Sequence, residues 1–237
     1  MKALILNSGL GSRMGLYTSE HPKCMTDISN TESILSNQLR LLKKAGVTDV
    51  VMTTGYYDKV LVEYCNSLGL SMNCEFVFNP LYSQTNYIYS IYCARKQLRG
   101  QDVVMMHGDL VFTLGVLEKT LNCQRSCMVI STTLPLPEKD FKAVVNGDKI
   151  ERIGIDFFDS AVAAQPLYKI FAKDWNVWLD KIVEFCENEQ RKCYAENAFN
   201  QVSDNCKIYA LDIKDELCGE IDTPQDLEII KKKFEGV

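Results

Sequence analysis

The sequence is short of histidine, of net positive charge and of long apolar runs. Its 237 residues include 2 His, and 26 Lys and Arg stand against 31 Asp and Glu, which leaves a net charge of −5. A chain without a broad basic field is a poor general binder of nucleic acids, so any anion must be met by a local site. Apolar runs such as residues 103–106 are far shorter than the ~20 residues that cross a bilayer, so we expect no membrane span.

Cysteine is abundant but lacks the spacing of a metal site. The 10 cysteines include no Cys-x-x-Cys pair, whereas structural zinc usually takes four ligands in two tight pairs. Several lie inside apolar or helical patterns, where a reduced thiol behaves as a small hydrophobic side chain. The first apolar run ends at residue 6, too early for the ~7–15 apolar residues of a secretory signal. We therefore expect free thiols and a cytoplasmic protein.

Apolar runs and amphipathic segments alternate along the first part of the chain. With 46% hydrophobic residues, the chain can bury a substantial core. Runs typical of strands buried on both faces lie at residues 3–6, 50–54, 74–78, 103–107 and 128–132. Helical periodicity is found at residues 34–45, 60–68, 88–98 and 114–121. This alternation predicts right-handed crossovers and a Rossmann-like, mostly parallel sheet flanked by helices.

After residue 135 the pattern changes. Alternating runs at residues 143–153 surround Asn146-Gly147, which predicts an antiparallel hairpin added to the sheet. A long amphipathic helix at residues 175–189, a polar segment, a strand at residues 207–213 and a last helix from Thr223 follow. No linker or repeat interrupts the chain, so we expect a single α/β domain over residues 1–237.

A glycine-rich loop follows the first predicted strand, with Gly9, Gly11 and Gly15 around Arg13. Such a loop can present successive N–H groups to phosphate oxygens. A dinucleotide-binding loop needs G-x-G-x-x-G, whereas the third glycine comes one place late here, and the G-x-x-x-x-G-K-[ST] string of a P-loop is absent. Arg13 and Lys23 instead suit a nucleoside triphosphate that loses pyrophosphate, unless both are solvated loop charges.

Several motifs together resemble the sugar-phosphate nucleotidyltransferase superfamily. LNSGLGSRMG at residues 6–15, followed by PKCM at 22–25, is similar to its L-A-[AG]-G-x-G-[ST]-R-[ML]…P-K-x-[ML] signature. Further segments narrow the resemblance: TGY at 54–56, NPLYSQTNYIYS at 79–90, HGD at 107–109 and EIDTPQDL at 220–227. In this order they resemble the small bacterial cytidylyltransferases that activate phosphocholine and 2-aminoethylphosphonate. The resemblance implies a single nucleotidyltransferase domain over residues 1–237 with a fold similar to GT-A.

The resemblance implies a catalytic set of Arg13, Lys23 and Asp109, with Asp109 binding Mg²⁺. A carboxylate at the carboxyl end of a parallel strand points into the crevice where such sheets bind ligands, which agrees with that role. The implied nucleotide-binding residues are Leu6, Asn7, Ser8, Gly9, Gly11, Ser12, Arg13, Lys23, Gly55, Tyr56, Asn86, Ser90 and Gly108. Asn7 and Ser8 depart from the Ala-Ala or Ala-Gly that relatives usually carry there.

The second metal ligand and the acceptor site depart most from the family pattern. The family's Y-x-D segment corresponds to residues 194–196, so Glu196 is the expected second metal ligand, with Asp222 as the other candidate and a solvated carboxylate as the alternative. Glu196, Glu220, Asp222 and Tyr168 are expected to face the acceptor. Carboxylates and aromatic rings suit an amine-bearing acceptor, although aromatic residues at helical spacing are usually core residues.

The predicted function is transfer of CMP from CTP to a small phosphorylated or phosphonate acceptor, with Mg²⁺ as cofactor and release of pyrophosphate. An acceptor phosphate is largely dianionic at neutral pH, so it can attack without a general base, and His107 is expected to be a packing or hydrogen-bonding residue. The alternatives are a sugar-1-phosphate nucleotidyltransferase using UTP or dTTP and a catalytically silent relative. A dinucleotide-dependent oxidoreductase is disfavoured by the glycine spacing.

Overall fold

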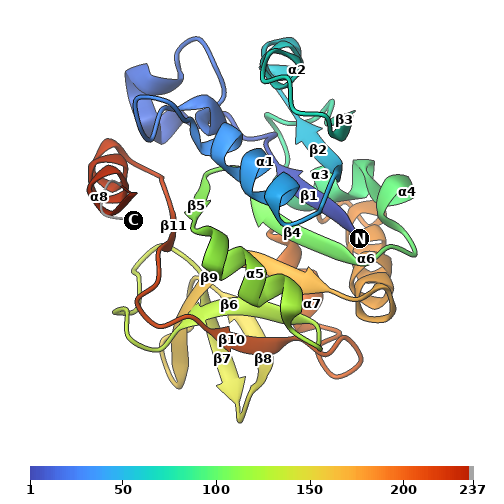
Figure 1. Ribbon diagram of the computed structural model, residues 1–237. Coiled ribbons are helices and arrows are strands. Elements are labelled where there is room, and N and C mark those ends of the chain that lie inside the picture. The colour runs from blue at the N-terminus through green and yellow to red at the C-terminus, as the bar shows by residue number, and fades with distance from the viewer. Residues whose placement is uncertain (235–237) are drawn as a thin grey trace.

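The computed structural model describes residues 1–234 and is built on a mixed sheet of nine strands with helices on both faces (Figure 1). The strand order is β3-β2-β1-β4-β9-β6-β10-β8-β7. These strands are β1 (Lys2–Leu6), β2 (Asp49–Thr54), β3 (Asn73–Phe78), β4 (Val103–His107), β6 (Cys127–Ser131), β7 (Lys142–Asn146), β8 (Lys149–Gly154), β9 (Ala161–Ile170) and β10 (Tyr209–Asp212). Two short strands, β5 (Leu110–Phe112) and β11 (Cys218–Glu220), pair separately.

The first half confirms the predicted alternation. Strands β3, β2, β1 and β4 run parallel, and the helices that follow them are α1 (Ile34–Lys44), α2 (Asp58–Ser67), α3 (Tyr87–Cys93), α4 (Arg95–Leu98) and α5 (Leu114–Asn122). Helix α1 begins where the Ser33 hydroxyl accepts from Ser36 N–H and ends before Gly46, whose φ of 81° favours glycine. The helix predicted over residues 88–98 is two helices, because Ala94 leaves helical geometry at ψ 2°.

The prediction of a mostly parallel sheet is wrong for the second half. Strand β9 runs antiparallel to both β4 and β6, and the predicted hairpin of β7 and β8 is present beyond them. The sequence pattern hides β9, because Gln165 and Pro166 interrupt it and proline is rare in central strands. Pro166 is tolerated because pairing with β4 stops at Leu167 and the register against β6 shifts between Met128 and Ile130.

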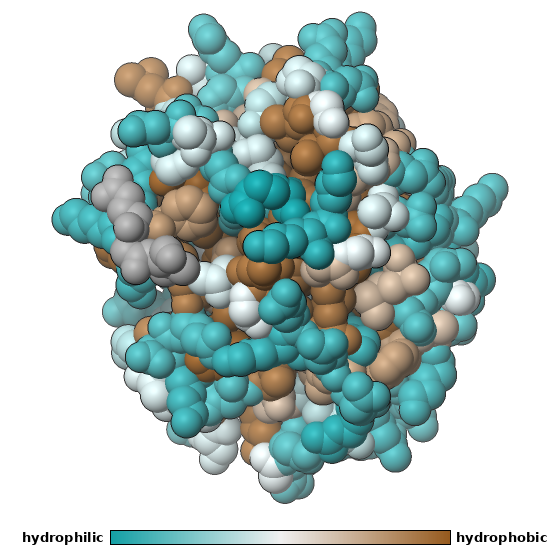
Figure 2. Space-filling model, viewed as in Figure 1, coloured by the Kyte–Doolittle hydropathy of each residue, from teal (hydrophilic) through white to brown (hydrophobic). Residues whose placement is uncertain are grey.

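The C-terminal helices are α6 (Ala172–Glu187), α7 (Ala195–Asn200) and α8 (Pro224–Phe234). Helix α8 begins as predicted, with Asp226 accepting from Thr223 N–H at 2.8 Å. Helix α7 lies in the segment that the sequence marks only as polar. Hydrophilic residues dominate the face shown in Figure 2, and no helix within residues 1–234 is long and apolar enough to span a membrane.

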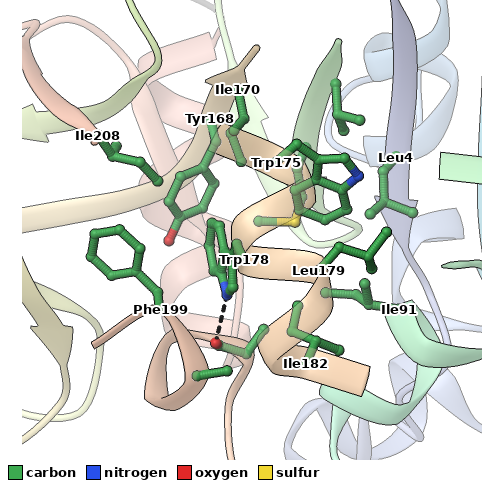
Figure 3. Packing of buried hydrophobic residues seen from close by; sticks show 14 of the residues in the cluster. Leu4, Ile91, Tyr168, Ile170, Trp175, Trp178, Leu179, Ile182, Phe199 and Ile208 are labelled. Atoms are coloured by element: carbon green, nitrogen blue, oxygen red, sulfur yellow. Dashed lines mark hydrogen bonds between the residues drawn. The ribbon is translucent and has the colours of Figure 1, made fainter. Parts of the chain in front are cut away.

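The core lies on both faces of the sheet because neighbouring β1 residues point to opposite sides. Leu4 packs with α3, α6 and α7, whereas Ile5 packs with α1, α2 and α5. Figure 3 shows the first of these clusters, where Trp178 stacks edge-on against Tyr168 at 5.7 Å between ring centroids. The Trp178 indole also donates to the Ala195 carbonyl at 2.8 Å, as the dashed line in Figure 3 marks. This bond fixes the start of α7 beneath the site described next.

Candidate active site

A cleft of about 460 Å³ opens at the carboxyl ends of β1 and β4. This is where ligands usually bind in open α/β sheets. The predicted residues in its lining are Leu6, Ser8, Gly9, Gly11, Ser12, Arg13, Lys23, Asn86, Ser90, Asp109, Glu220 and Asp222. The predicted residues outside its lining are Asn7, Gly55, Tyr56, Gly108, Tyr168 and Glu196.

Charged residues from distant parts of the chain meet in this cleft. The Lys23 ammonium lies 2.5 Å from Asp109 Oδ2 and 2.6 Å from Asp222 Oδ1, and Arg13 Nη2 lies 2.8 Å from the same Asp222 oxygen. Burial alone would lower the pKa of Lys23, but Asp109 and Asp222 more than offset it, so the pKa is raised. Burial opposes ionisation of Asp109, yet Lys23 and His107 lower its pKa. Both charges of this pair are therefore maintained.

The glycine loop covers Lys23 closely. Gly11 has a φ of 66°, and a Cβ atom on it would lie 3.1 Å from Lys23 Cβ. The Thr18 hydroxyl donates to the Gly11 carbonyl at 3.1 Å, which ties the loop to the kinked 3-10 segment that follows it, Ser12–Thr18. Glycine at position 11 is thus required both by its backbone conformation and by contact with the lysine.

Asp109 also has the features of a metal ligand. Its carboxylate stands beside two further groups that can bind a metal ion, His107 and Glu220. One ligand atom each from His107, Asp109 and Glu220 lie within 4.8 Å of one another. Mg²⁺ prefers one or two carboxylates completed by phosphate oxygens and water. Asp109, with either Asp222 or Glu220, therefore fits a Mg²⁺ ion.

His107 and Glu220 form a hydrogen-bonded pair beside Asp109. His107 Nδ1 lies 2.8 Å from Glu220 Oε1. Burial by itself lowers the pKa of His107, but its hydrogen bond and charge interaction with Glu220 raise the pKa to about 9. Burial and the nearby Asp109 raise the pKa of Glu220 to about 7, although His107 opposes this. The pair therefore retains a proton near neutral pH, and His107 makes the hydrogen bond that its position predicts.

Glu196 and Tyr168, which were expected to face the acceptor, lie beneath the cleft and are not part of its lining. Tyr168 is fully buried on β9 and donates to Glu196 Oε1 at 2.9 Å, while the Tyr87 hydroxyl donates to Glu196 Oε2. Glu196 is itself only 1% exposed. Because both of its oxygens are engaged by tyrosines, Glu196 is not free to share a metal with Asp109 in this conformation.

The residues expected near the base are split between the cleft and its surroundings. Asn86 lines the cleft and caps α3, accepting from Tyr87 N–H at 2.7 Å. Ser90 is held by Asn79 Nδ2 at 2.9 Å. Gly55 packs behind the loop, since a Cβ atom there would lie 2.4 Å from the Ser8 carbonyl oxygen. Tyr56 is 63% exposed outside the cleft.

An aromatic wall, consisting of Tyr87, Phe141 and Tyr194, forms another side of the cleft. The ring centroids of Tyr87 and Tyr194 are 5.9 Å apart, and those of Phe141 and Tyr194 are 5.1 Å apart. The sequence predicted no role in the site for Phe141 or Tyr194. In the sequence, Phe141 is marked only by its position before the hairpin, and Tyr194 only by its place in the segment at residues 194–196. Their contact joins distant parts of the chain, so no local pattern indicates it.

Known proteins share both sequence and fold with this chain. The model of the MobA-like NTP transferase domain matches residues 3–137, more than half of the chain. The CTP:phosphoglutamine cytidylyltransferase of Campylobacter jejuni is 28% identical over 135 residues, covering 55% of this chain and 52% of that protein. The choline-phosphate cytidylyltransferase of Streptococcus pneumoniae is 26% identical over 259 aligned positions, covering 98% of this chain and 100% of that protein.

The chain thus spans about half the length of the first relative and all of the second. Among solved structures, the inositol-1-phosphate CTP transferase from T. maritima superposes with a TM-score of 0.79 at 22% identity. The match covers 100% of this chain and 97% of that structure, so the α/β fold is shared. On the strength of the family model, the chain belongs to the MobA-like NTP transferase domains.

Proposed function

We propose that the protein transfers CMP from CTP to a small, amine-bearing phosphate or phosphonate and releases pyrophosphate. The observation that carries this proposal is the meeting of Lys23, Asp109 and Asp222 directly beside the glycine loop. The relatives named for phosphoglutamine and choline phosphate support both the nucleotide and the class of acceptor. The ten free thiols support a cytoplasmic setting for the reaction.

The loop and the cations would bind the triphosphate. Backbone N–H groups of residues 9–13 can hold phosphate oxygens, and Arg13, which is 62% exposed on its side chain, can move toward the leaving pyrophosphate. Lys23 would exchange its carboxylate partners for phosphate oxygens. Asp109 and Asp222 would hold Mg²⁺, which when bound neutralises charge on the reacting phosphates. Asn86 and the backbone near Gly55 are proposed to help read the base.

The reaction itself needs positioning more than proton transfer. An acceptor oxygen attacks the α-phosphorus of CTP, and the bond from that phosphorus to the oxygen bridging to the β-phosphorus breaks. Pyrophosphate leaves with the bonding electron pair, and no proton has to be removed from a dianionic acceptor. Lys23 and Arg13 then serve to align the phosphates and to stabilise the charge that develops. This assignment leaves His107 as a partner of Glu220 rather than a base.

The acceptor would bind against the aromatic wall. Tyr87, Phe141 and Tyr194 offer ring faces, and Glu220 and Asp222 lie in the same cleft lining. Rings and carboxylates together attract a cationic amine or ammonium group. Glu196 and Tyr168 would contribute indirectly, by holding the Tyr87 hydroxyl and the floor beneath it.

A crossed panel of substrates tests this function. Pyrophosphate release is measured with Mg²⁺ for CTP, UTP, ATP and dTTP, each paired with phosphocholine, 2-aminoethylphosphonate or glucose 1-phosphate. We expect release with CTP and an amine-bearing acceptor. Release only with another triphosphate would overturn the cytidylyl assignment, and release only with glucose 1-phosphate would indicate a sugar nucleotidyltransferase. No release in any combination would favour a catalytically silent relative.

A further inference from the structure

A small cavity lies behind the glycine loop, beside the cleft. It has a volume of about 60 Å³, and its lining includes Asn7, Lys23, Gly108 and Asp109. Within this lining, Asn7 Nδ2 and Asp109 Oδ1 are both buried, and neither has a hydrogen-bond partner within the protein. Buried polar atoms nearly always have a partner, either a protein group or an ordered water molecule. Because Asn7 and Asp109 line the same small cavity, the unpartnered donor of one and the unpartnered acceptor of the other call for a joint explanation.

Asn7 is seated specifically against the segment that carries Asp109. A Cβ atom on Gly108 would lie 1.6 Å from Asn7 Oδ1, so only glycine leaves room for this amide. Gly108 N–H also donates to the Leu6 carbonyl at 3.1 Å, which holds the turn after β4 against the end of β1. Asn7 is only 8% exposed, and its amide lies against Gly108, the residue that precedes Asp109.

The cavity has a size and polarity that suit an ordered water molecule. A water occupies roughly 30 Å³ in the liquid and is retained where two or more polar groups can bind it. Such a water can accept a hydrogen bond from Asn7 Nδ2 and donate one to Asp109 Oδ1. The carboxylate would then be fixed through Oδ1, and Oδ2, which faces Lys23 at 2.5 Å, would be left for a cation.

We propose that Asn7 is a positioning residue that orients the Asp109 carboxylate through one buried water molecule and thereby raises the affinity of the site for a divalent metal ion. Residues that hydrogen-bond to a metal ligand without binding the metal themselves commonly raise the affinity for the metal by about 10- to 100-fold. This inference rests on the proposed metal-binding role of Asp109. It also gives a purpose to the asparagine that stands where the family signature usually has alanine.

Binding of Mn²⁺ tests the proposal directly, by water-proton relaxation enhancement in nucleotide-free protein and again with CTP. We expect Asn7→Ala to weaken Mn²⁺ binding about 10-fold. Asn37→Ala is the matched control, because Asn37 is also buried, on α1, and its Nδ2 is also unpaired. It should leave the Mn²⁺ affinity unchanged. A high-resolution crystal structure of the wild type should show a water within hydrogen-bonding distance of Asn7 Nδ2 and Asp109 Oδ1.

The outcomes separate this inference from the proposed function. If Asp109→Asn removes Mn²⁺ binding but Asn7→Ala retains wild-type affinity, the metal site stands and the role of Asn7 is refuted. If Asp109→Asn leaves Mn²⁺ binding intact, or the wild type binds none, the metal-binding role of Asp109 fails and the inference fails with it. A well-ordered crystal without that water contradicts the bridge even if Asn7→Ala is too unstable to assay.

Discussion

The two sides of the cleft are built in different ways. The nucleotide side consists of a glycine loop and a few charged residues that sit in short sequence motifs, and its key contacts are ion pairs such as Lys23 with Asp109. The acceptor side consists of side chains from α3, the loop before β7 and the segment before α7, whose rings meet in tilted and edge-to-face arrangements. Binding of a triphosphate depends on backbone shape and fixed charge, whereas recognition of an acceptor depends on how distant segments pack.

The largest expected effect is on the nucleotide side. Lys23→Met and Asp109→Asn should each lower the rate of pyrophosphate release by about 10²- to 10³-fold, because each removes a charge that the transition state needs. Steady-state kinetics with CTP and the best acceptor measure the loss. Lys149→Met, which breaks a surface ion pair with Asp204, is the matched control and should retain full activity. A rate within threefold of wild type for Asp109→Asn would refute its catalytic role.

The second prediction tests whether Glu196 stabilises the fold or binds the metal ion. Glu196→Ala leaves the hydroxyls of Tyr87 and Tyr168 without their acceptor, so the free energy of unfolding should fall by about 2 kcal/mol. Urea unfolding measures this loss, and Glu196→Gln, which keeps an acceptor oxygen, should lose less. The dependence of activity on Mg²⁺ concentration should stay near that of the wild type. A large increase in the Mg²⁺ requirement of Glu196→Gln would instead make Glu196 a metal ligand.

The aromatic wall should respond to the charge of the acceptor alone. Phe141→Leu keeps apolar bulk but removes a ring face, so the KM for a cationic acceptor should rise about fivefold. The KM for CTP should not change. Phe158→Leu is the control, because Phe158 is 53% exposed and is not part of the cleft lining. If Phe141→Leu raised the KM for CTP as much as the KM for the acceptor, the nucleotide and acceptor sides of the cleft would not bind their ligands independently.

The smallest predicted effect is that of alkylating a cysteine, and the two sides of the cleft each offer one to compare. Cys24 is 2% exposed next to Lys23, and burial raises its pKa well above the ordinary value for a thiol, so it should resist alkylation. Cys193 is partly exposed beside Tyr194 and should react more readily. Mass spectrometry locates the alkylated cysteine. Alkylation of Cys193 should raise the KM for the acceptor about twofold, because the added group disturbs the packing of the neighbouring Tyr194 ring. Protein with Cys193→Ser should be insensitive to the reagent.

The nucleotide side of the cleft could be predicted from the sequence better than the acceptor side, because its residues lie in short local motifs. The strands and helices of the first half, the cap of α8 and the hairpin at Asn146-Gly147 depend on local patterns, and all are present. The proximity of Lys23, Asp109 and Asp222 was indicated by motif order, although the sequence alone could not show that one lysine would contact both carboxylates. Their catalytic and metal-binding roles stay predictions.

The acceptor side could not be predicted in the same way. Tyr168 and Glu196 look like polar or aromatic surface residues in the sequence, but long-range packing of β9 against α6 and α7 buries both. Strand β9 itself is hidden by Pro166, because its pairing changes along its length: β7 contacts residues 161–163 and β4 contacts residues 167–170. No periodicity within ten residues can show that a strand has different neighbours at its two ends.

This division of β9 has a consequence for the autonomy of the segment that carries the family signature. Residues 3–137 include β4 and β6 but not β9, the strand that lies between them. A fragment ending there would expose one edge of β4 and leave β6 without either of its partners, β9 and β10. Exposed strand edges promote aggregation. The N-terminal half that matches the family model is therefore not a module that can be excised or shuffled, and any recombinant chimera must include the strand that begins at Ala161.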